Sequence, residues 1–291
     1  MKNQLPNLLI FIFFSYFFSI YTSYAQDGLY PYQVDMSMSA KYLGPNALPV
    51  PKIKDGLLPK YTYVKLGGEY QESVGDITRN LYTESYIRLF SNRVGLNIQL
   101  VPYEYFSTDS ITRAERKVVV HDPSGSAIGD VYIGTYIQLL RDHWWLPDLV
   151  LTINLKTASG SKLKMARYTD APGYFFDVSA GKTFEIENSF IKSFRPYGML
   201  GFYAYQTYET TFKQNDSFLY GIGFHTTFSK FDINNAYGGY NGYIGNGDQP
   251  KVYRFIASTT FENRLNFEFR FQKGFKDFEY DTFRICAKYR L

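Results

Sequence analysis

Residues 265–272, LNFEFRFQ, decide the fold, because every second residue in them is apolar. Leu265, Phe267, Phe269 and Phe271 alternate with polar residues. Successive side chains of a β-strand point to opposite faces, so this segment predicts a strand with one apolar and one polar face. The same period of two recurs in residues 149–156 and 94–100. We therefore expect an all-β protein.

Composition narrows the class of protein. Aromatic residues make up 19% of the 291 residues, which excludes an intrinsically disordered chain. The single cysteine excludes a disulfide scaffold, and a mean hydropathy of -0.26 argues against a bundle of membrane helices. A net charge of +4 is too small to indicate nucleic-acid binding. A secreted soluble β-sandwich and a membrane β-barrel are the two classes that fit.

Three features favour the transmembrane, up-and-down antiparallel β-barrel. The expected strands reach the 9 to 11 residues that a tilted membrane strand needs. Short and long connections alternate, as in bacterial barrels, and aromatic residues gather at strand ends, as at membrane interfaces. We predict about twelve strands, while ten and fourteen also fit the pattern. They lie near residues 61–71, 82–90, 93–106, 130–141, 148–157, 174–186, 195–212, 218–231, 233–243, 251–262, 264–273 and 279–291.

The first 60 residues differ from the rest. Residues 1–25 have an apolar core at 8–20 and small residues before Gln26, which predicts a signal peptide cleaved near Ala25/Gln26. An uncleaved membrane anchor is the alternative. Residues 26–60 contain five prolines, which predicts an extended segment without a central strand or long helix. This segment could lie at the periplasmic rim, enter the barrel or serve as a linker, and residues 61–291 form the barrel.

The polar face of each strand predicts the side chains that line the lumen. Charges of both signs occur there, and two interpretations stay open: a salt-bridge network that fills the lumen, or a pore lining that selects solutes by charge. The basic residues of the last strands predict a basic wall that favours anions. The expected lumen residues are Lys65, Glu69, Glu84, Arg88, Lys156, Asp177, His225, Arg254, Glu268, Arg270, Arg284 and Lys288.

Candidate catalytic residues are few. His225 has a hydroxyl two residues on, at Thr227, which is similar to the His-x-Ser of outer-membrane phospholipases. The hydroxyl is not a serine, and the alternation directs His225 into the lumen rather than toward lipid. We therefore assign no catalytic residue. No histidine pair has metal-ligand spacing and there is one cysteine, so we expect neither a metal nor a cofactor.

The end of the chain carries a resemblance. Phe283, Ile285, Ala287, Tyr289 and Leu291 alternate up to the last residue. This resembles the terminal strand of Gram-negative outer-membrane barrels, which the barrel assembly machinery recognises, although that pattern prefers a terminal aromatic residue. The resemblance implies an outer-membrane location, contact with outer-membrane lipid, and passage through periplasmic chaperones. The aromatic-rich style resembles barrels of Bacteroidota.

A narrower resemblance rests on residues 151–160, LTINLKTASG, and residues 173–182. These are similar to outer-membrane transporters associated with the degradation of aromatic compounds, which implies passage of small hydrophobic molecules. Our first interpretation is an outer-membrane channel or binding protein for a small solute. The alternatives are a plugged structural or surface-interaction barrel without transport, and a lipid-modifying barrel enzyme. The sequence indicates neither the solute nor the oligomeric state.

Overall fold

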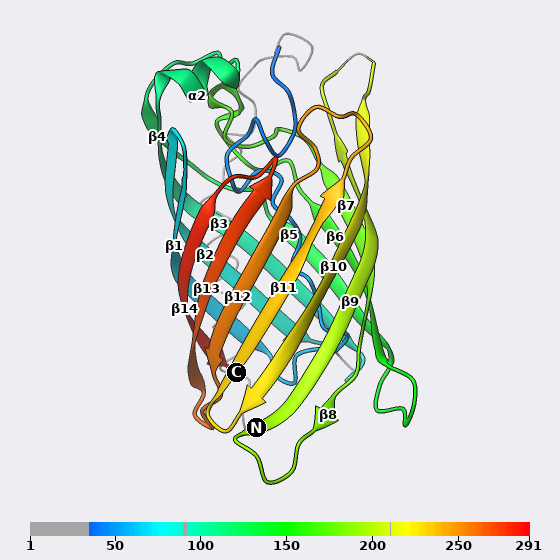
Figure 1. Cartoon of the computed structure of the whole chain (residues 1–291). Helices are drawn as coiled ribbons and strands as arrows, with labels where there is room; N and C mark the ends of the chain where they lie inside the picture. Colours follow the sequence, from blue (N-terminus) through cyan, green and yellow to red (C-terminus); the bar gives the residue numbers. More distant parts are fainter. Residues whose placement is uncertain (1–34, 90–91, 210) are drawn as a thin grey trace, which may run out of the picture.

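The computed structural model describes residues 35–89, 92–209 and 211–291. Twelve long antiparallel strands form a closed ring in which each strand pairs with two neighbours (Figure 1). Two short strands, β4 (Ser124–Ala127) and β8 (Phe184–Glu185), add to β3 and β9. The predicted all-β barrel of twelve strands is therefore confirmed. In ring order the strands are β1 (Tyr63–Ser73), β2 (Asp76–Arg88), β3 (Val94–Thr108), β5 (Tyr132–Leu140), β6 (Asp148–Lys156), β7 (Gly173–Gly181), β9 (Ile191–Gln206), β10 (Gln214–Phe228), β11 (Phe231–Asn241), β12 (Lys251–Thr259), β13 (Leu265–Lys276) and β14 (Asp281–Arg290).

The ring closes where β14 pairs with β1, with Glu69 opposite Arg284 and Val64 opposite Tyr289. The period of two decides which side chains face inward. In β14, Arg284 is buried inside the barrel, whereas Ile285 is 65% exposed on the outside. Closure gives every strand two partners, so no edge is left with unpaired backbone groups.

The connections fall at two ends of the barrel. At the upper rim, residues 109–131 carry the helix α2 (Ser110–Glu115) and β4, and residues 157–172 carry the short 3-10 helix η2 (Leu163–Met165) (Figure 1). The lower rim holds shorter connections, such as residues 229–230, and the last residue of the chain. The expected alternation of long and short connections is therefore present at these positions.

Several predicted boundaries are wrong by four to six residues. The strand expected at 174–186 ends at Gly181, and the strand expected at 195–212 runs from Ile191 to Gln206. The strand expected to start at residue 82 begins at Asp76, and only Val74 and Gly75 connect it to β1 at the upper rim. Asp76, Thr78 and Asn80 are buried inside the barrel, so a polar inner face gave this part of β2 the composition of a loop.

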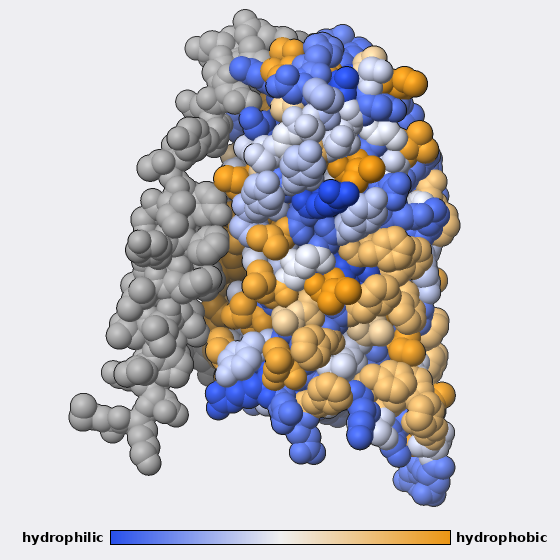
Figure 2. Space-filling view, turned by 90° about the vertical axis from the view of Figure 1, so that its left-hand side faces the viewer, coloured by the Kyte–Doolittle hydropathy of each residue, from blue (hydrophilic) through white to orange (hydrophobic). Residues whose placement is uncertain are grey.

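The outer surface is apolar around the barrel. Figure 2 shows hydrophobic side chains gathered in a band over the middle and lower part of one face, with hydrophilic side chains at both ends. Phe267, Ile222 and Leu200 are among the exposed residues of the strands. Such a band between polar rims is typical of a barrel whose outer face meets hydrocarbon. In the described part of the chain, no helix has the length and apolarity to cross a membrane. The predicted signal peptide lies outside the described residues.

Candidate functional site: a lumen occupied by the N-terminal segment

Residues 35–60, called the plug below, run through the lumen from the upper rim to the lower rim (Figure 1). At the upper rim the Gly44 N–H donates to the Ala166 carbonyl oxygen, at 2.8 Å. At the lower rim the Lys60 carbonyl oxygen accepts from Arg88, at 2.6 Å. Of the three positions that the sequence left open for this segment, the described part of it takes the one inside the barrel.

The plug has no regular secondary structure, so its backbone carbonyl groups need donors from the wall. Wall side chains from four different strands supply them. The bonds run from Tyr240 to Leu48 O (2.9 Å), from Arg254 to Val50 O and to Pro51 O (2.7 Å), from Arg195 to Asp55 O (2.7 Å), and from Gln138 to Gly56 O (2.8 Å). These contacts hold the plug around much of the circumference of the barrel.

A buried ion pair adds to this attachment. The Lys54 ammonium lies 2.5 Å from Asp177 of β7, and both side chains are almost fully buried. The same ammonium lies over the rings of Tyr136 and Phe175, at 5.6 and 5.8 Å from their centroids. Separating a buried pair of this kind leaves an uncompensated charge, so the pair opposes movement of the plug.

Apolar side chains fill the upper part of the lumen. Met38, Leu43 and Leu48 of the plug belong to one buried cluster with Tyr203 and Tyr240 of the wall. Tyr203 and Tyr240 meet edge to face, with ring centroids 5.2 Å apart. This half of the barrel is packed as the core of a soluble protein is packed.

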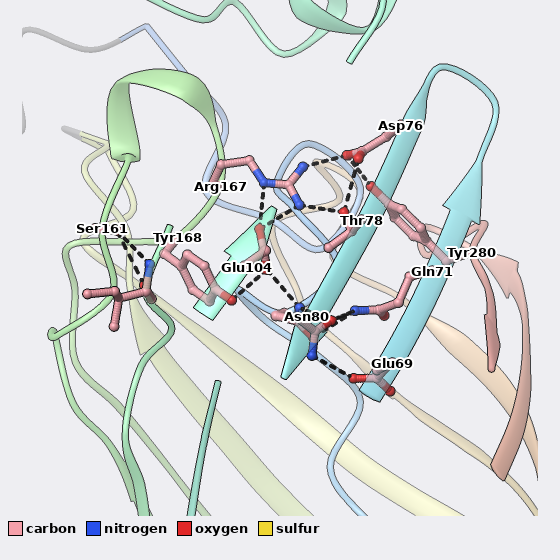
Figure 3. A network of polar contacts seen from close by, with 12 residues as sticks. Glu69, Gln71, Asp76, Thr78, Asn80, Glu104, Ser161, Arg167, Tyr168 and Tyr280 are labelled. Atoms are coloured by element: carbon pink, nitrogen blue, oxygen red, sulfur yellow. Dashed lines mark hydrogen bonds and ion pairs between the residues drawn. The ribbon is translucent and has the colours of Figure 1, made fainter. Parts of the chain in front are cut away.

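The loop of residues 157–172 closes over the plug through one buried arginine, which Figure 3 shows at the centre of a polar network. Arg167 is fully buried and contacts Asp76 at 2.7 Å, Glu104 at 2.8 Å and Thr78 at 2.7 Å. Burial alone would lower the pKa of the Arg167 guanidinium, but the carboxylates of Glu104 and Asp76 raise it above its ordinary value. Arg167 is therefore a permanent cation that joins the loop to β2 and β3.

The network reaches the plug as well. Asn46 donates to Glu104, at 2.8 Å, and Gly44 packs directly on the Arg167 side chain. A Cβ at Gly44 would lie 2.7 Å from Arg167 Cζ, so a larger residue would displace the guanidinium. Arg116 and Tyr280 complete the network by binding Asp76, each at 2.7 Å.

A basic wall faces the plug on the other side of the barrel. Arg254, Arg270 and Arg284 project inward from the adjacent strands β12, β13 and β14. Arg270 pairs with Glu69, and Arg284 lies 3.4 Å from Glu268.

Lysines extend this wall toward the lower rim. Lys65 bridges Glu268 at 2.6 Å and Glu84 at 3.6 Å. Lys288 lies over the ring of Tyr63, 4.2 Å from its centroid. Lys52 of the plug, whose side chain is about half exposed, lies 3.9 Å from Glu84.

Two adjoining cavities lie beside the plug in the described part of the chain. A small central cavity of about 110 Å³ lies between the plug and the wall, where Tyr82, Asn154 and Arg254 line it. A larger vestibule of about 770 Å³ lies toward the lower rim and is lined by residues such as Lys60, His225 and Arg290. The two cavities share Lys52 and Lys65, so they adjoin.

The structure places the sequence-predicted lumen residues as follows. Lys65, Glu69, Glu84, Lys156, Asp177, Arg254, Glu268 and Arg284 are buried inside the barrel, and His225, Arg270 and Lys288 are half-buried there. Arg88 lies at the lower rim and is exposed. In the terminal strand Phe283, Ile285, Tyr289 and Leu291 are exposed on the outside, and Ala287 is half-buried.

Sequence reasoning missed the residues that the plug and the loops contribute. Arg167 comes from a loop, and Lys52 and Lys54 come from a segment for which a linker was one expectation. One sequence pattern could have predicted these lysines. They lie next to Asp55 in a segment that also contains apolar residues, such as Leu48 and Ile53, which the structure shows to be buried.

His225 faces the lumen and lies between two carboxylates. Asp55 is 3.6 Å from its Nδ1 and Asp232 is 3.6 Å from its Nε2. A lipid hydrolase needs its nucleophile at the lipid face, so this geometry does not suit that activity. In the described ranges, no cluster of three or more histidine, cysteine or acidic residues has the arrangement of a metal site.

Comparison with known proteins gives a likeness of fold. No protein-family model and no curated protein matches the sequence. The structure is similar to the COG4313 outer membrane channel from Pseudomonas putida F1, with a TM-score of 0.56 and 11% identity over 83% of this chain and 98% of that chain.

Two further similarities are weaker. One is to the KdgM porin, with a TM-score of 0.42 and 10% identity over 78% of this chain and 99% of that chain. The other is to the β domain of the Bordetella autotransporter BrkA, with a TM-score of 0.46 and 11% identity over 79% and 99% of the two chains. The likeness to the COG4313 channel shows that the chain has the fold of an outer-membrane β-barrel channel.

Proposed function

We propose that this chain is a passive outer-membrane channel for a small solute, and that its plug closes the resting state. The observation that carries the proposal is the vestibule of about 770 Å³, which adjoins a charged central cavity lined by both the plug and the wall. The likeness of fold to a channel of known structure supports it. Passage requires the plug to move.

The lining favours an anionic solute. Arg254, Arg270, Arg284 and Lys288 form one wall, and Glu69 and Glu268 are the carboxylates that pair with two of them. Excess positive charge in the lining of a pore lowers the barrier for anions and raises it for cations. A charged lining suits such a solute better than the small hydrophobic molecules that the narrower sequence resemblance implies.

A second candidate is a plugged barrel without transport. The observation in its favour is the packed upper half, where Met38 and Leu43 are fully buried among wall tyrosines. On this alternative the barrel is structural or presents its upper loops to a partner. Mobility of the plug separates the two candidates.

A disulfide that ties the plug to the wall tests the proposal. A Cβ built at Gly221 lies 2.7 Å from Ile53 Cγ1, so two cysteines at these positions are within reach of a disulfide. The variant is Ile53→Cys with Gly221→Cys, in a Cys286→Ala background. The control keeps Gly221 and carries the other two changes.

The measurement is single-channel conductance in planar bilayers, before and after reduction. We expect the oxidised pair to be silent and the reduced pair to conduct like the control. Equal conductance in both redox states would show that the plug is not the gate. Silence of the control as well would favour the barrel without transport.

A further inference from the structure

Arg254 is a buried cation held by neutral groups. Its Nε donates to the Gln272 side-chain oxygen at 2.6 Å, and its two terminal nitrogens donate to the carbonyl oxygens of Val50 and Pro51. Among the described residues, no carboxylate lies within ion-pairing distance, 4.0 Å, of its guanidinium. Burial of a charge without a counter-charge is unfavourable, and carbonyl dipoles compensate for it only in part.

The neighbours of Arg254 increase this cost. Arg270 and Arg284 face each other across β13 and β14, and each of these two has a carboxylate, Glu69 and Glu268 respectively. Three guanidinium groups on adjacent strands therefore share two carboxylates. Glu268 also pairs with Lys65, so positive charge is in excess at the point where the plug crosses this wall.

The bonding pattern suggests what the excess charge is for. A guanidinium presents parallel N–H groups that match the two oxygens of a carboxylate, and bonds to an ionised acceptor are about twice as strong as bonds to a neutral one. In the closed state, two adjacent carbonyl oxygens of the plug take these N–H groups.

We propose that Arg254 is an oxyanion site for which the plug and a carboxylate-bearing solute compete. A solute carboxylate that binds Arg254 displaces the carbonyl groups of Val50 and Pro51 and thereby loosens the plug. The solute class rests on the proposed function, but binding and displacement do not require a conducting channel.

The route to the site starts in the vestibule. Lys52 lines both cavities, Arg254 lines the central one, and the vestibule lies toward the lower rim. A small anion can therefore approach Arg254 past half-exposed lysine without crossing the packed upper half. A ligand shifts a conformational equilibrium only by the difference in its affinity for the two states. The plug carbonyl groups occupy Arg254 in the closed state and leave it free when the plug moves, so an anion should bind the open state more tightly.

The barrel supplies a matched control residue. Arg195 also donates to a plug carbonyl, Asp55 O, at 2.7 Å. Unlike Arg254, it has its own carboxylate, Asp148, at 2.8 Å. Loss of either arginine should loosen the plug, but only loss of Arg254 should remove the response to an anion.

The experiment measures exposure of the plug by thiol labelling. Ala47 is fully buried in the plug, so Ala47→Cys in a Cys286→Ala background reports its release. The purified protein in detergent is treated with a polyethylene-glycol maleimide, and the rate of the gel shift is followed. The probe is sodium succinate; sodium chloride at equal ionic strength and the uncharged butane-1,4-diol are the controls.

We expect succinate, and neither control solute, to raise the labelling rate several-fold. With Arg254→Gln added, labelling should be faster without succinate and should not respond to it. With Arg195→Gln added, labelling should be faster and should still respond. Equal rates in succinate and chloride, or a response that survives Arg254→Gln, would overturn the proposal. A plug that responds in a barrel that never conducts would overturn the channel and leave this inference standing.

Discussion

Replacement of Arg167 by methionine tests whether the polar network holds the upper rim together. Arg167 contacts two buried carboxylates, Asp76 and Glu104, at 2.7 and 2.8 Å. Removing one partner of a buried ion pair costs about 3–5 kcal/mol. Asp76 keeps Arg116 and Tyr280 as partners, so we expect the lower end, about 3 kcal/mol of unfolding free energy.

The assay is unfolding in urea in detergent micelles, followed by intrinsic fluorescence. Arg167→Met should lower the midpoint and leave the slope unchanged, because the surface exposed on unfolding stays the same. The control is Lys162→Met, an exposed position in the same loop, which should shift the free energy by less than about 0.5 kcal/mol. Combining Arg167→Met with Glu104→Gln should cost less than the two single changes together, because the second removes a charge that the first leaves unpaired. A decrease in unfolding free energy of less than about 1 kcal/mol for Arg167→Met would refute the reasoning, because loss of one partner of a buried ion pair destabilises a protein by more than that.

Three further predictions follow from the barrel, its charges and the path of the plug. The closed barrel should migrate faster in SDS gels unheated than boiled, because the sheet resists detergent; equal mobility of the two samples would contradict closure. The double change Lys52→Glu with Lys288→Glu should move the reversal potential in a salt gradient toward cation selectivity, because both lysines line the vestibule. The control, Lys213→Glu in the upper connection between β9 and β10, should leave the potential unchanged. An unchanged potential in the double variant would exclude the basic residues as the selectivity filter. The long connections of bacterial barrels lie outside the cell, so we expect the upper rim at the cell surface. A short epitope inserted before Asp35, which pairs with Lys117 at this rim, should therefore bind antibody on intact cells; staining only after permeabilisation would show the opposite orientation.

The barrel could be predicted from the sequence because apolar and polar residues alternate along each strand and so identify its outer and inner faces. Phe267 and Phe269 alternate with Glu268 and Arg270, and twelve segments of this kind give a closed sheet whose inner face is charged. The pattern is weakest where the inner face is fully polar and a charge interrupts the outer face, as at Arg79 near the start of β2, and the boundary predicted there was wrong.

The site could be predicted only in part, because the plug and the loops contribute residues to it that do not lie on strands. Periodicity indicates the wall residues, such as Arg254 and Asp177, but contains no information on what lies opposite them. Lys54 meets Asp177 across 123 positions of sequence. Arg167 meets Asp76 across 91 positions, through a loop whose path only packing decides.

Glu104 shows a further reason. β3 has an irregularity opposite Leu81 and Thr83, and the alternation changes phase across it. Val101 and Glu104 consequently both face inward, although they are three residues apart. A bulge of this kind cannot be read from an alternating pattern, because the pattern assumes an unbroken register.

The path of the plug constrains the order of assembly. The plug enters at the upper rim and ends where β1 begins, at the lower rim, so it lies inside a ring that is completed only when β14 meets β1. The plug must be placed inside before β14 pairs with β1, or else it must be threaded through a barrel that is already closed. A folded domain fused ahead of residue 35 is far wider than the barrel. It would prevent threading through a closed barrel, but it would not prevent closure of the barrel around a plug that is already in place.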